Sequence, residues 1–469
     1  MRIAALVLVF FILLSPDFQV AARLPVVRAE DGIILVFLIA LCLAPRRCLR
    51  KLPPGHHDKI SIAILIMGGM AFLSICFSAL RNPIVVNDFM VLPMLLKYWL
   101  IYKMAQSLAE PRARLYCLYA LVAAVGLSAV VGILQFHSAG GIGNWLSARY
   151  EWGAAQQMDP EELEAALANR RVGGTHGDPR YFGYLLVAGL GACASLWLYL
   201  RRGTGRLLAI CVAPLCLVAL IYTASRTAML GLVIVAILAV IIQQRTRGIN
   251  AKALIAWGLL AIVGLSVFVG FLTTSFKERV FRTDTDSYET SVHARKRDFI
   301  RPFSQALEDP AMILVGKGPS KAVLRSSSHN DIGWHFQHFG LPGLAAYLFL
   351  IGFGLKRAWL VLKSCPPPAE GALHLAALLV LVVWALFIMA ESIFKDAQIM
   401  ALNMFMLGLL APAPAAVPAA LRFPARQRLK TMSVPAGAIR RVPWPRPQRP
   451  FAMRRAPRIT GPWARRVGH

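Results

Sequence analysis

Long uninterrupted apolar runs dominate the sequence and limit the folds open to it. Most of the runs are about 17 to 25 residues long, the length that an α-helix needs to cross the roughly 30 Å hydrocarbon core of a bilayer. Of the 469 residues, 57% are hydrophobic and only 16% are charged, which is less charge than soluble domains carry. A membrane β-barrel would show short alternating segments instead. The sequence therefore predicts an all-α polytopic membrane protein.

We expect about twelve transmembrane helices, of which the first two are short. Basic residues concentrate in alternate short loops, and such loops lie in the cytoplasm. On this basis both termini are expected to be cytoplasmic and two long loops to lie outside. The predicted spans are 3–15, 32–44, 59–79, 88–107, 114–136, 181–200, 206–224, 227–244, 253–273, 339–356, 372–390 and 396–412.

These spans and loops divide the chain into six predicted parts. Spans one to five occupy 1–136, spans six to nine 181–273, and spans ten to twelve 339–421. The two outer loops are 137–180 and 274–338, and the larger one is expected to carry the chemistry. Residues 422–469 are expected to form a disordered basic cytoplasmic tail.

The net charge of +28 could suggest a nucleic-acid partner, but the location of the charge argues against one. The tail carries 13 Lys or Arg and no Asp or Glu. Such a segment is attracted to anionic membrane lipids by about 1 kcal/mol per basic residue near the surface. We therefore expect membrane lipids as partners and no nucleic acid. None of the eight cysteines lies in an outer loop, so no disulfide is expected there.

Some basic residues lie in the outer loops, against the usual bias. Arg170 and Arg171 lie in the first outer loop, and Arg180 follows at its end. They indicate an anionic partner at the level of the lipid headgroups or, alternatively, salt bridges to Glu161, Glu162 and Glu164. These acidic residues belong to a short amphipathic helix that we predict at 160–169.

Arg226 lies in the very short connection between spans seven and eight, so rigid helices on both sides fix its position. A charge at the membrane boundary is costly unless it is paired or used. Two interpretations stay open: the side chain extends to the headgroup region, or its guanidinium binds a phosphate.

The second outer loop ends in three serines followed by His329 and Asn330, with His335 and His338 close behind. A neutral imidazole suits general-base chemistry near pH 7. Three histidines also raise the possibility of zinc, but no HExxH motif or nearby cysteine supports it. We expect His335 and His338, which are three positions apart, to pack or to bond locally.

The spacing around His329 resembles the signature of the O-antigen ligase family. In that signature His is followed by Asn, Ser or Gln, then nine residues, Gly, two residues, and a small residue or Tyr. Here His329-Asn330 is followed, after nine residues, by Gly340-Leu-Pro-Gly343. Proteins of that family also have a Ser-Arg pair after the seventh span, and Ser225-Arg226 resembles it in sequence and position.

Two more features of the second outer loop are similar to that family. Arg295 precedes the aromatic residue Phe299, and Gly316-Lys317-Gly318 lies upstream of the histidine. The resemblance covers about 170–350. It departs from the family where Phe299 replaces a common Trp and Arg180 replaces a common Asn.

The resemblance implies a GT-C-like, inverting glycosyltransferase in the inner membrane of a bacterial cell. The donor would be a glycan on undecaprenyl diphosphate, and the acceptor a hydroxyl of lipid A–core oligosaccharide. His329 would deprotonate that hydroxyl, while Arg226 and Arg295 would hold the diphosphate. The further substrate-binding candidates are Asn330, Gly340, Gly343, Arg171, Arg297 and Lys317.

No metal or other cofactor is expected, because cationic side chains can neutralise the diphosphate. Asp284 and Asp286 do form a DxD pair, which holds a metal in enzymes that use nucleotide sugars. Nucleotide sugars are cytoplasmic, however, and this loop is predicted outside, so we interpret the pair as ordinary loop acidity.

Two rival functions stay open. An O-antigen or exopolysaccharide polymerase would use the same donor but a glycan acceptor that is itself linked to lipid. A transporter of lipid-linked glycans would place polar or broken segments at mid-membrane. The predicted spans are nearly free of charge apart from Lys97 and Lys103, which favours an enzyme working at the outer face.

Overall fold

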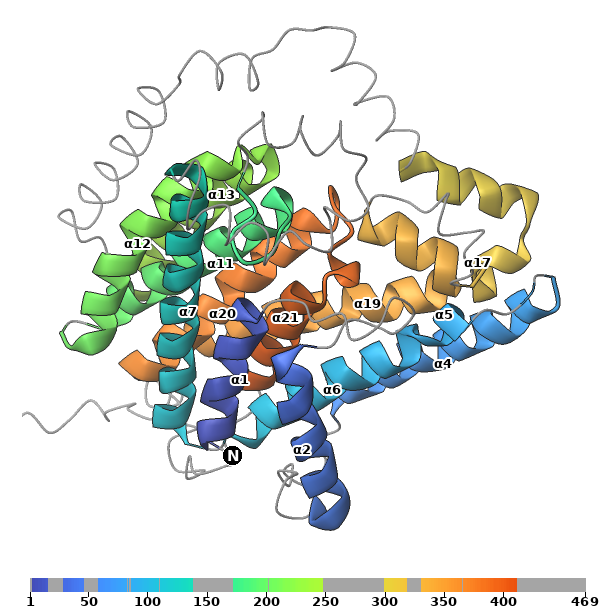
Figure 1. Ribbon diagram of the computed structural model, residues 1–469, viewed down its shortest axis with the longest axis horizontal. Helices are drawn as coiled ribbons and strands as arrows, with labels where there is room; N and C mark the ends of the chain where they lie inside the picture. The colour runs from blue at the N-terminus through green and yellow to red at the C-terminus, as the bar shows by residue number, and fades with distance from the viewer. Residues whose placement is uncertain are drawn as a thin grey trace, which may run out of the picture. The chain divides into compact units, whose positions relative to one another are not determined.

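The computed structural model describes the chain in several stretches, and its regular elements there are all helices (Figure 1). The chain divides into two units, Met1–Ala415 and Ala416–His469. The predicted tail, the predicted helix 160–169 and the predicted ninth span lie outside the described residues. The described residues are 2–15, 28–45, 58–81, 83, 86–108, 110–137, 172–200, 202–247, 299–318, 330–364 and 366–410.

Most of the helices follow the predicted spans closely, whereas the helical stretches 299–308 and 311–315 lie within the predicted outer loop 274–338. Predicted span four is divided between two helices at Met90, and predicted span ten is part of a much longer helix. The helices are α1 (Arg2–Leu14), α2 (Ala29–Leu43), α4 (Lys59–Ala79), α5 (Val86–Phe89), α6 (Val91–Ser107), α7 (Pro111–His137), α11 (Pro179–Tyr199), α12 (Thr204–Thr223), α13 (Arg226–Arg247), α17 (Ala311–Val315), α19 (Asp331–Lys363), α20 (Pro368–Phe387), the 3-10 helix η1 (Ile393–Lys395) and α21 (Ala397–Leu409).

Seven of the described helices are long and apolar enough to cross a membrane, which confirms a polytopic helical membrane protein. Two shorter apolar helices, Ile3–Leu14 and Ala397–Leu409, accompany them. The count of twelve spans and the GT-C-like arrangement stay predictions. The seven spanning segments are Lys59–Ala79, Pro111–His137, Pro179–Tyr199, Thr204–Thr223, Thr227–Gln244, Asp331–Lys363 and Pro368–Phe387.

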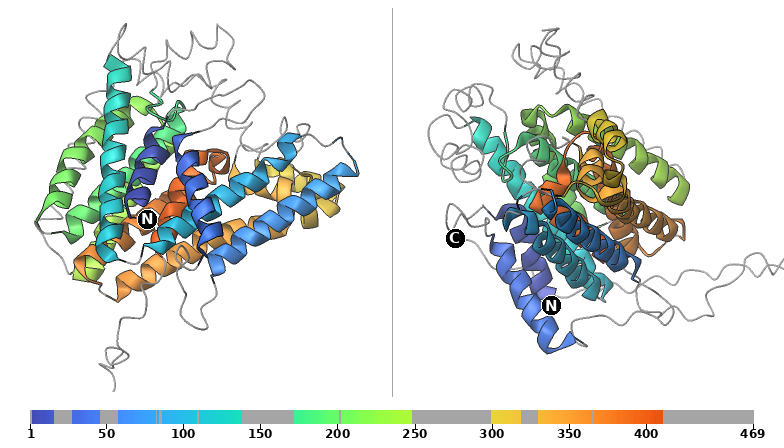
Figure 2. Two further views of the ribbon diagram at one scale, coloured as in Figure 1. Left: turned by 60° about the horizontal axis from the view of Figure 1, so that its bottom comes forward. Right: turned by 90° about the vertical axis from the view of Figure 1, so that its right-hand side faces the viewer.

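α11 and α20 pack against each other at the centre and are buried along most of their lengths. α13 instead exposes Leu230, Val233 and Ile237, a spacing that places them on one face of the helix. An exposed apolar face of this kind is expected on a helix that contacts lipid. α4, α6 and α19 run beside one another, as the two views of Figure 2 also show.

Small residues allow the central helices to approach closely. A Cβ atom on Gly408 of α21 would lie only 2.4 Å from the carbonyl oxygen of Tyr102 on α6. Membrane helices associate largely through such close packing, because lipid offers no hydrophobic driving force between them. Replacing Gly408 would therefore push α21 and α6 apart.

α19 bends sharply at Gly340, which divides it into a first arm, 331–339, and a second arm, 341–363. Gly340 has φ 69° and ψ −173°, a conformation that strongly favours glycine, and Pro342 follows it. A Cβ on Gly340 would lie 2.7 Å from the backbone carbon of Leu314. The bend lets the two arms pack against each other, so that His335 of the first arm stacks on Tyr347 of the second arm.

The two lysines that the sequence analysis found within spans both have acidic partners. Lys97 Nζ lies 2.6 Å from Asp31 Oδ1 and 3.3 Å from Glu30 Oε1, at the start of α2. Lys103 forms an ion pair with Asp58, which precedes α4. These partners are not evident from the sequence, because they lie on other segments of the chain. Pairing explains how the structure tolerates them, because an unpaired charge within the membrane is costly.

Replacing Lys103 with methionine is expected to lower the free energy of unfolding by about 3 to 5 kcal/mol. The substitution leaves Asp58 charged and mostly buried without its cation, although the Tyr102 hydroxyl and the backbone N and hydroxyl of Ser61 remain as hydrogen-bond donors. Thermal unfolding of the purified protein in detergent measures the effect. Adding Asp58→Asn to Lys103→Met should recover most of the loss, and an unchanged melting temperature in the single variant would contradict the pair's importance.

The same pair has a definite pH dependence. Burial raises the pKa of Asp58, but the hydrogen bond and charge of Lys103, together with hydrogen bonds from Tyr102 and Ser61, lower it by a larger amount. The net pKa therefore lies below its ordinary value of 3.8. A carboxyl with a lowered folded-state pKa stabilises the fold fully above its unfolded-state pKa. The contribution of Asp58 is therefore present above pH 3.8 and is lost as the pH falls through the lower folded-state value.

Candidate functional site

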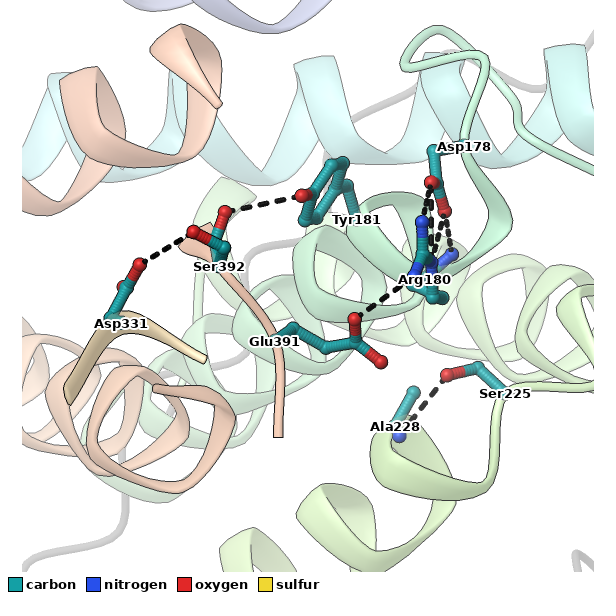
Figure 3. A network of polar contacts seen from close by, with 8 residues as sticks. All are labelled: Asp178, Arg180, Tyr181, Ser225, Ala228, Asp331, Glu391 and Ser392. Carbon is teal, nitrogen blue, oxygen red and sulfur yellow. Dashed lines mark hydrogen bonds and ion pairs between the residues drawn. The ribbon is translucent and has the colours of Figure 1, made fainter. Parts of the chain in front are cut away.

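Three connections between helices meet at one group of polar side chains, and a fourth packs on α11 nearby (Figure 3). The three are the start of α11, the start of α19, and the segment 388–396 between α20 and α21; the fourth is the turn between α12 and α13. The basic-loop pattern of the sequence predicts all four on the same side of the membrane. We call the group the junction cluster; its members are Asp178, Arg180, Tyr181, Asp331, Glu391 and Ser392.

Arg180 joins the start of α11 to the segment 388–396. Its guanidinium lies 2.7 Å from Asp178 Oδ2 and 3.1 Å from Glu391 Oε2. The side chain of Glu391 is almost fully buried, whereas that of Arg180 is 43% exposed. The guanidinium of Arg180 is thus bound by two carboxylates, and the rest of its surface is accessible to solvent. The sequence left two interpretations of Arg180 open, an anionic partner or salt bridges, and the structure shows salt bridges. The partners are Asp178 and Glu391. The predicted partners Glu161, Glu162 and Glu164 lie outside the described residues.

Local sequence explains why α11 begins where it does. Asp178 accepts a hydrogen bond from the backbone N of Arg180 at 2.7 Å, and Pro179 occupies the first helical position. Both residues are favoured at helix starts. The same carboxylate therefore caps the helix and fixes the orientation of Arg180.

Asp331 fixes the first turn of α19 on the segment 388–396. Its buried carboxylate accepts hydrogen bonds from the backbone N of Phe394 at 3.0 Å and from the Tyr347 hydroxyl at 2.6 Å. The hydroxyl of Ser392 lies 3.3 Å from it, and the backbone carbonyl of Ser392 accepts a bond from Tyr181 at 3.1 Å. Asp331 therefore links α19 indirectly to α11.

Asn330 caps α19, with its side-chain oxygen accepting a hydrogen bond from the backbone N of Gly333 at 2.7 Å. The side chain is buried. The structure thus gives Asn330 a structural contact, and its predicted role in substrate binding stays a prediction. His329 directly precedes it and lies outside the described residues, but the chain that follows His329 is firmly held.

The turn before Arg226 packs against α11 one turn beyond Arg180. A Cβ on Gly183 would lie 2.8 Å from Ala228 Cβ and 3.3 Å from Ser225 Cβ, so glycine allows this close approach. Ala224 has φ 49°, which is uncommon for a residue other than glycine. The backbone of Arg226 begins α13 directly after this turn, and its side chain lies outside the described residues.

The Gly316-Lys317-Gly318 segment runs along the far end of the first arm of α19. The backbone N of Lys317 donates to Gln337 O at 2.7 Å, and that of Gly318 donates to His338 O at 3.3 Å. The bend at Gly340 leaves these carbonyls without the usual helical donors, and the segment supplies them. Gly343 likewise packs closely, since a Cβ there would lie 2.4 Å from Phe339 Cβ.

His335 and His338 pack and bond locally, as expected. Both are fully buried, and each donates its Nδ1 hydrogen to the carbonyl four residues earlier, at 2.8 Å and 2.7 Å. His335 also stacks on Tyr347 with ring centroids 3.8 Å apart. In the described ranges no group of three or more His, Cys, Asp or Glu side chains is arranged to hold a metal ion. Metal independence stays a prediction.

The predicted site residues that the structure describes divide into two groups. Asn330 and the backbone of Arg226 lie at or beside the junction cluster, and Lys317, Gly340 and Gly343 lie at the other end of the first arm. His329, Arg171, Arg295 and Arg297 lie outside the described residues, as does the DxD pair Asp284 and Asp286.

Sequence reasoning missed most of the junction cluster. Glu391 is an isolated acid between two apolar runs, and Asp331 follows the predicted histidine by two positions. Both could have been noticed as charges at the ends of spans. Their partners could not, because Arg180 and Glu391 are 211 positions apart.

The fold and this site define the class: a polytopic helical membrane protein with a polar, partly exposed cluster where three interhelical connections meet. No protein-family model and no curated protein sequence matches the chain.

Proposed function

We propose that the protein is a metal-independent glycosyltransferase of the O-antigen ligase type. It transfers a glycan from undecaprenyl diphosphate to a hydroxyl of lipid A–core oligosaccharide at the outer face of a bacterial inner membrane. One observation supports this most: the element that follows His329 and the turn that precedes Arg226 both adjoin the junction cluster. These two residues, far apart in the sequence, are the ones to which the family resemblance assigns the base and a phosphate ligand.

In the proposed reaction the acceptor hydroxyl oxygen attacks the anomeric carbon of the donor sugar. His329 accepts the hydroxyl proton, and the bond between the anomeric carbon and the diphosphate oxygen breaks. The diphosphate leaves with the bonding electron pair, and Arg226 and Arg295 stabilise its added negative charge. Direct displacement inverts the anomeric configuration.

Arg180 is a positioning residue in this proposal. Its guanidinium is engaged by Asp178 and Glu391, so these carboxylates already neutralise its charge. It holds the start of α11, and with it the turn before Arg226, against the segment that anchors Asp331. Arg171, Arg297 and Lys317 complete the proposal as further cations for the anionic donor.

Product analysis with the purified full-length protein in vesicles tests the proposal. With undecaprenyl diphosphate-linked glycan and lipid A–core supplied, and EDTA present throughout, we expect glycan attached to lipid A–core. Transfer persists in EDTA because protein cations stabilise the leaving diphosphate.

Three outcomes would overturn parts of this proposal. Longer chains that remain on undecaprenyl diphosphate would identify a polymerase, and movement of intact donor across the vesicle membrane without a new glycosidic bond would identify a transporter. Activity that EDTA abolishes and Mg²⁺ or Mn²⁺ restores would refute metal independence and make Asp284 and Asp286 candidate ligands.

A further inference from the structure

Residues 299–308 form a helix with three different faces. Pro302 and Ala306 are buried and face the protein. Ile300, Phe303 and Leu307 are exposed and apolar, and their spacing of three and four places them on one side of the helix. The third face is exposed and polar, with Arg301, Ser304 and Glu308.

The exposed apolar face is not explained by packing within the described part of the chain. Leu307 is 83% exposed and Leu314, on the adjoining α17, is 65% exposed. Large apolar side chains left in water cost roughly 25 cal/mol for each Å² of exposed apolar surface. A helix that combines an apolar face with a charged face typically lies in the plane of a membrane interface.

Exposed apolar side chains also occur on the spanning helix next to this face. The backbone of Leu314 lies against the bend at Gly340, and Leu341, which directly follows Gly340, is exposed at the start of the second arm of α19. Leu348 and Phe349 continue the exposed apolar surface along that arm. Because the second arm belongs to a spanning segment, lipid is the medium that covers its exposed apolar residues.

Three contacts hold the helix 299–308 at this level. The ring of Phe303 stacks on Phe336 of the first arm with centroids 4.8 Å apart, and Gln337 donates to Gln305 at 3.3 Å. Asp309 forms a 2.6 Å ion pair with Arg81, two residues beyond the end of α4. The helix is therefore tied to the ends of two spanning helices rather than extending away from them.

We propose that the helix 299–308 and Leu314 lie in the membrane interface, with Ile300, Leu307 and Leu314 inserted among the lipid acyl chains while the ring of Phe303 packs on Phe336. The leaflet is the one at which the second arm of α19 begins. The polar face, with Arg301 and Glu308, lies toward the headgroups and water. This part of the predicted outer loop 274–338 is thus membrane-bound, and this inference does not depend on the proposed reaction.

Membrane attachment fixes the depth of the first arm of α19. Asp331 holds one end of the arm on the segment 388–396, and Phe336 and Gln337 tie its other half to the interfacial helix. The arm is short and supported at both ends. It therefore keeps a constant distance from the lipid headgroups.

Fluorescence quenching in the full-length protein tests this placement. An environment-sensitive fluorescent amino acid is introduced at position 307, and a matched variant carries it at position 304 on the polar face of the same helix. Each variant is reconstituted in vesicles of phosphatidylethanolamine and phosphatidylglycerol. We expect lipids with brominated acyl chains to quench position 307 several-fold more than aqueous iodide does, and the opposite order at position 304.

Two results would overturn the proposal. Quenching of position 307 by iodide and not by brominated lipid would place this face in water. Quenching by neither would show that protein covers it, either another segment of this chain or a second copy. Leu307 makes few contacts because it is so exposed, so folding should be preserved; if the melting temperature falls, position 314 carries the label instead, with the same expected order.

Discussion

Replacing His329 with alanine is expected to lower the turnover of glycan transfer by about a hundredfold to ten-thousandfold, the usual contribution of a positioned general base. Without the imidazole, the acceptor hydroxyl must attack while still carrying its proton. The following residues strengthen this expectation, because Asn330 caps α19 and Asp331 anchors it. A histidine beside such a fixed helix start loses little entropy when it takes up its catalytic position.

Turnover is measured in the reconstituted system with saturating donor and acceptor, per mole of correctly inserted protein. The matched control is His374→Ala. His374 lies in α20 and donates to the carbonyl of Glu370 at 2.8 Å, away from the junction cluster. Its loss should leave turnover within about twofold, since no proton transfer depends on it. Near wild-type transfer by His329→Ala would remove that residue from the mechanism.

Replacing Arg226 with lysine is expected to reduce kcat by about a hundredfold or more, equivalent to about 2.7 kcal/mol of transition-state stabilisation. Lysine keeps the charge but loses the planar fork that binds two phosphate oxygens at once. The helix start at Arg226 follows a tightly packed turn at Gly183, so the backbone cannot move to compensate for the shorter reach of the new donor.

The separation of kcat from KM distinguishes this role from simple donor binding. An interaction that strengthens as the diphosphate leaves is lost from kcat, whereas equal binding of donor and transition state is lost from KM alone. Arg206→Lys is the matched control, because it makes the same exchange near the start of α12, away from Arg226. The guanidinium of Arg206 lies over the ring of Trp197, 4.3 Å from its centroid. Unchanged turnover in Arg226→Lys would leave Arg226 as a residue that only extends to the headgroups.

The length of the apolar runs was sufficient to predict the class of fold. Each predicted span outside 253–273 falls on a described helix or, for 88–107, on two consecutive helices. The bilayer imposes this result, because a spanning segment must satisfy its backbone hydrogen bonds internally and must be long enough to cross. Local signals such as Asp178-Pro179 also predict where a helix begins.

The bend in α19 could be predicted only in part. Gly340 and Pro342 are visible in the sequence as helix-disturbing residues, yet the predicted span began at 339 and ignored the helical residues before it. What requires glycine at the bend, besides its positive φ, is the close approach of the Leu314 backbone. That contact depends on how a distant segment of the chain folds back.

The partners of the charged residues were decided by tertiary structure alone. Sequence identifies Lys97 and Arg180 as charges that need an explanation, but their partners are distant in the chain: Asp31 lies in α2 and Glu391 in the segment 388–396. Apolar patterns are local and repeat along one helix, so they can be recognised from consecutive residues. An ion pair between residues 211 positions apart exists only because packing between α11 and α20 brings their ends together, and no local pattern encodes that packing.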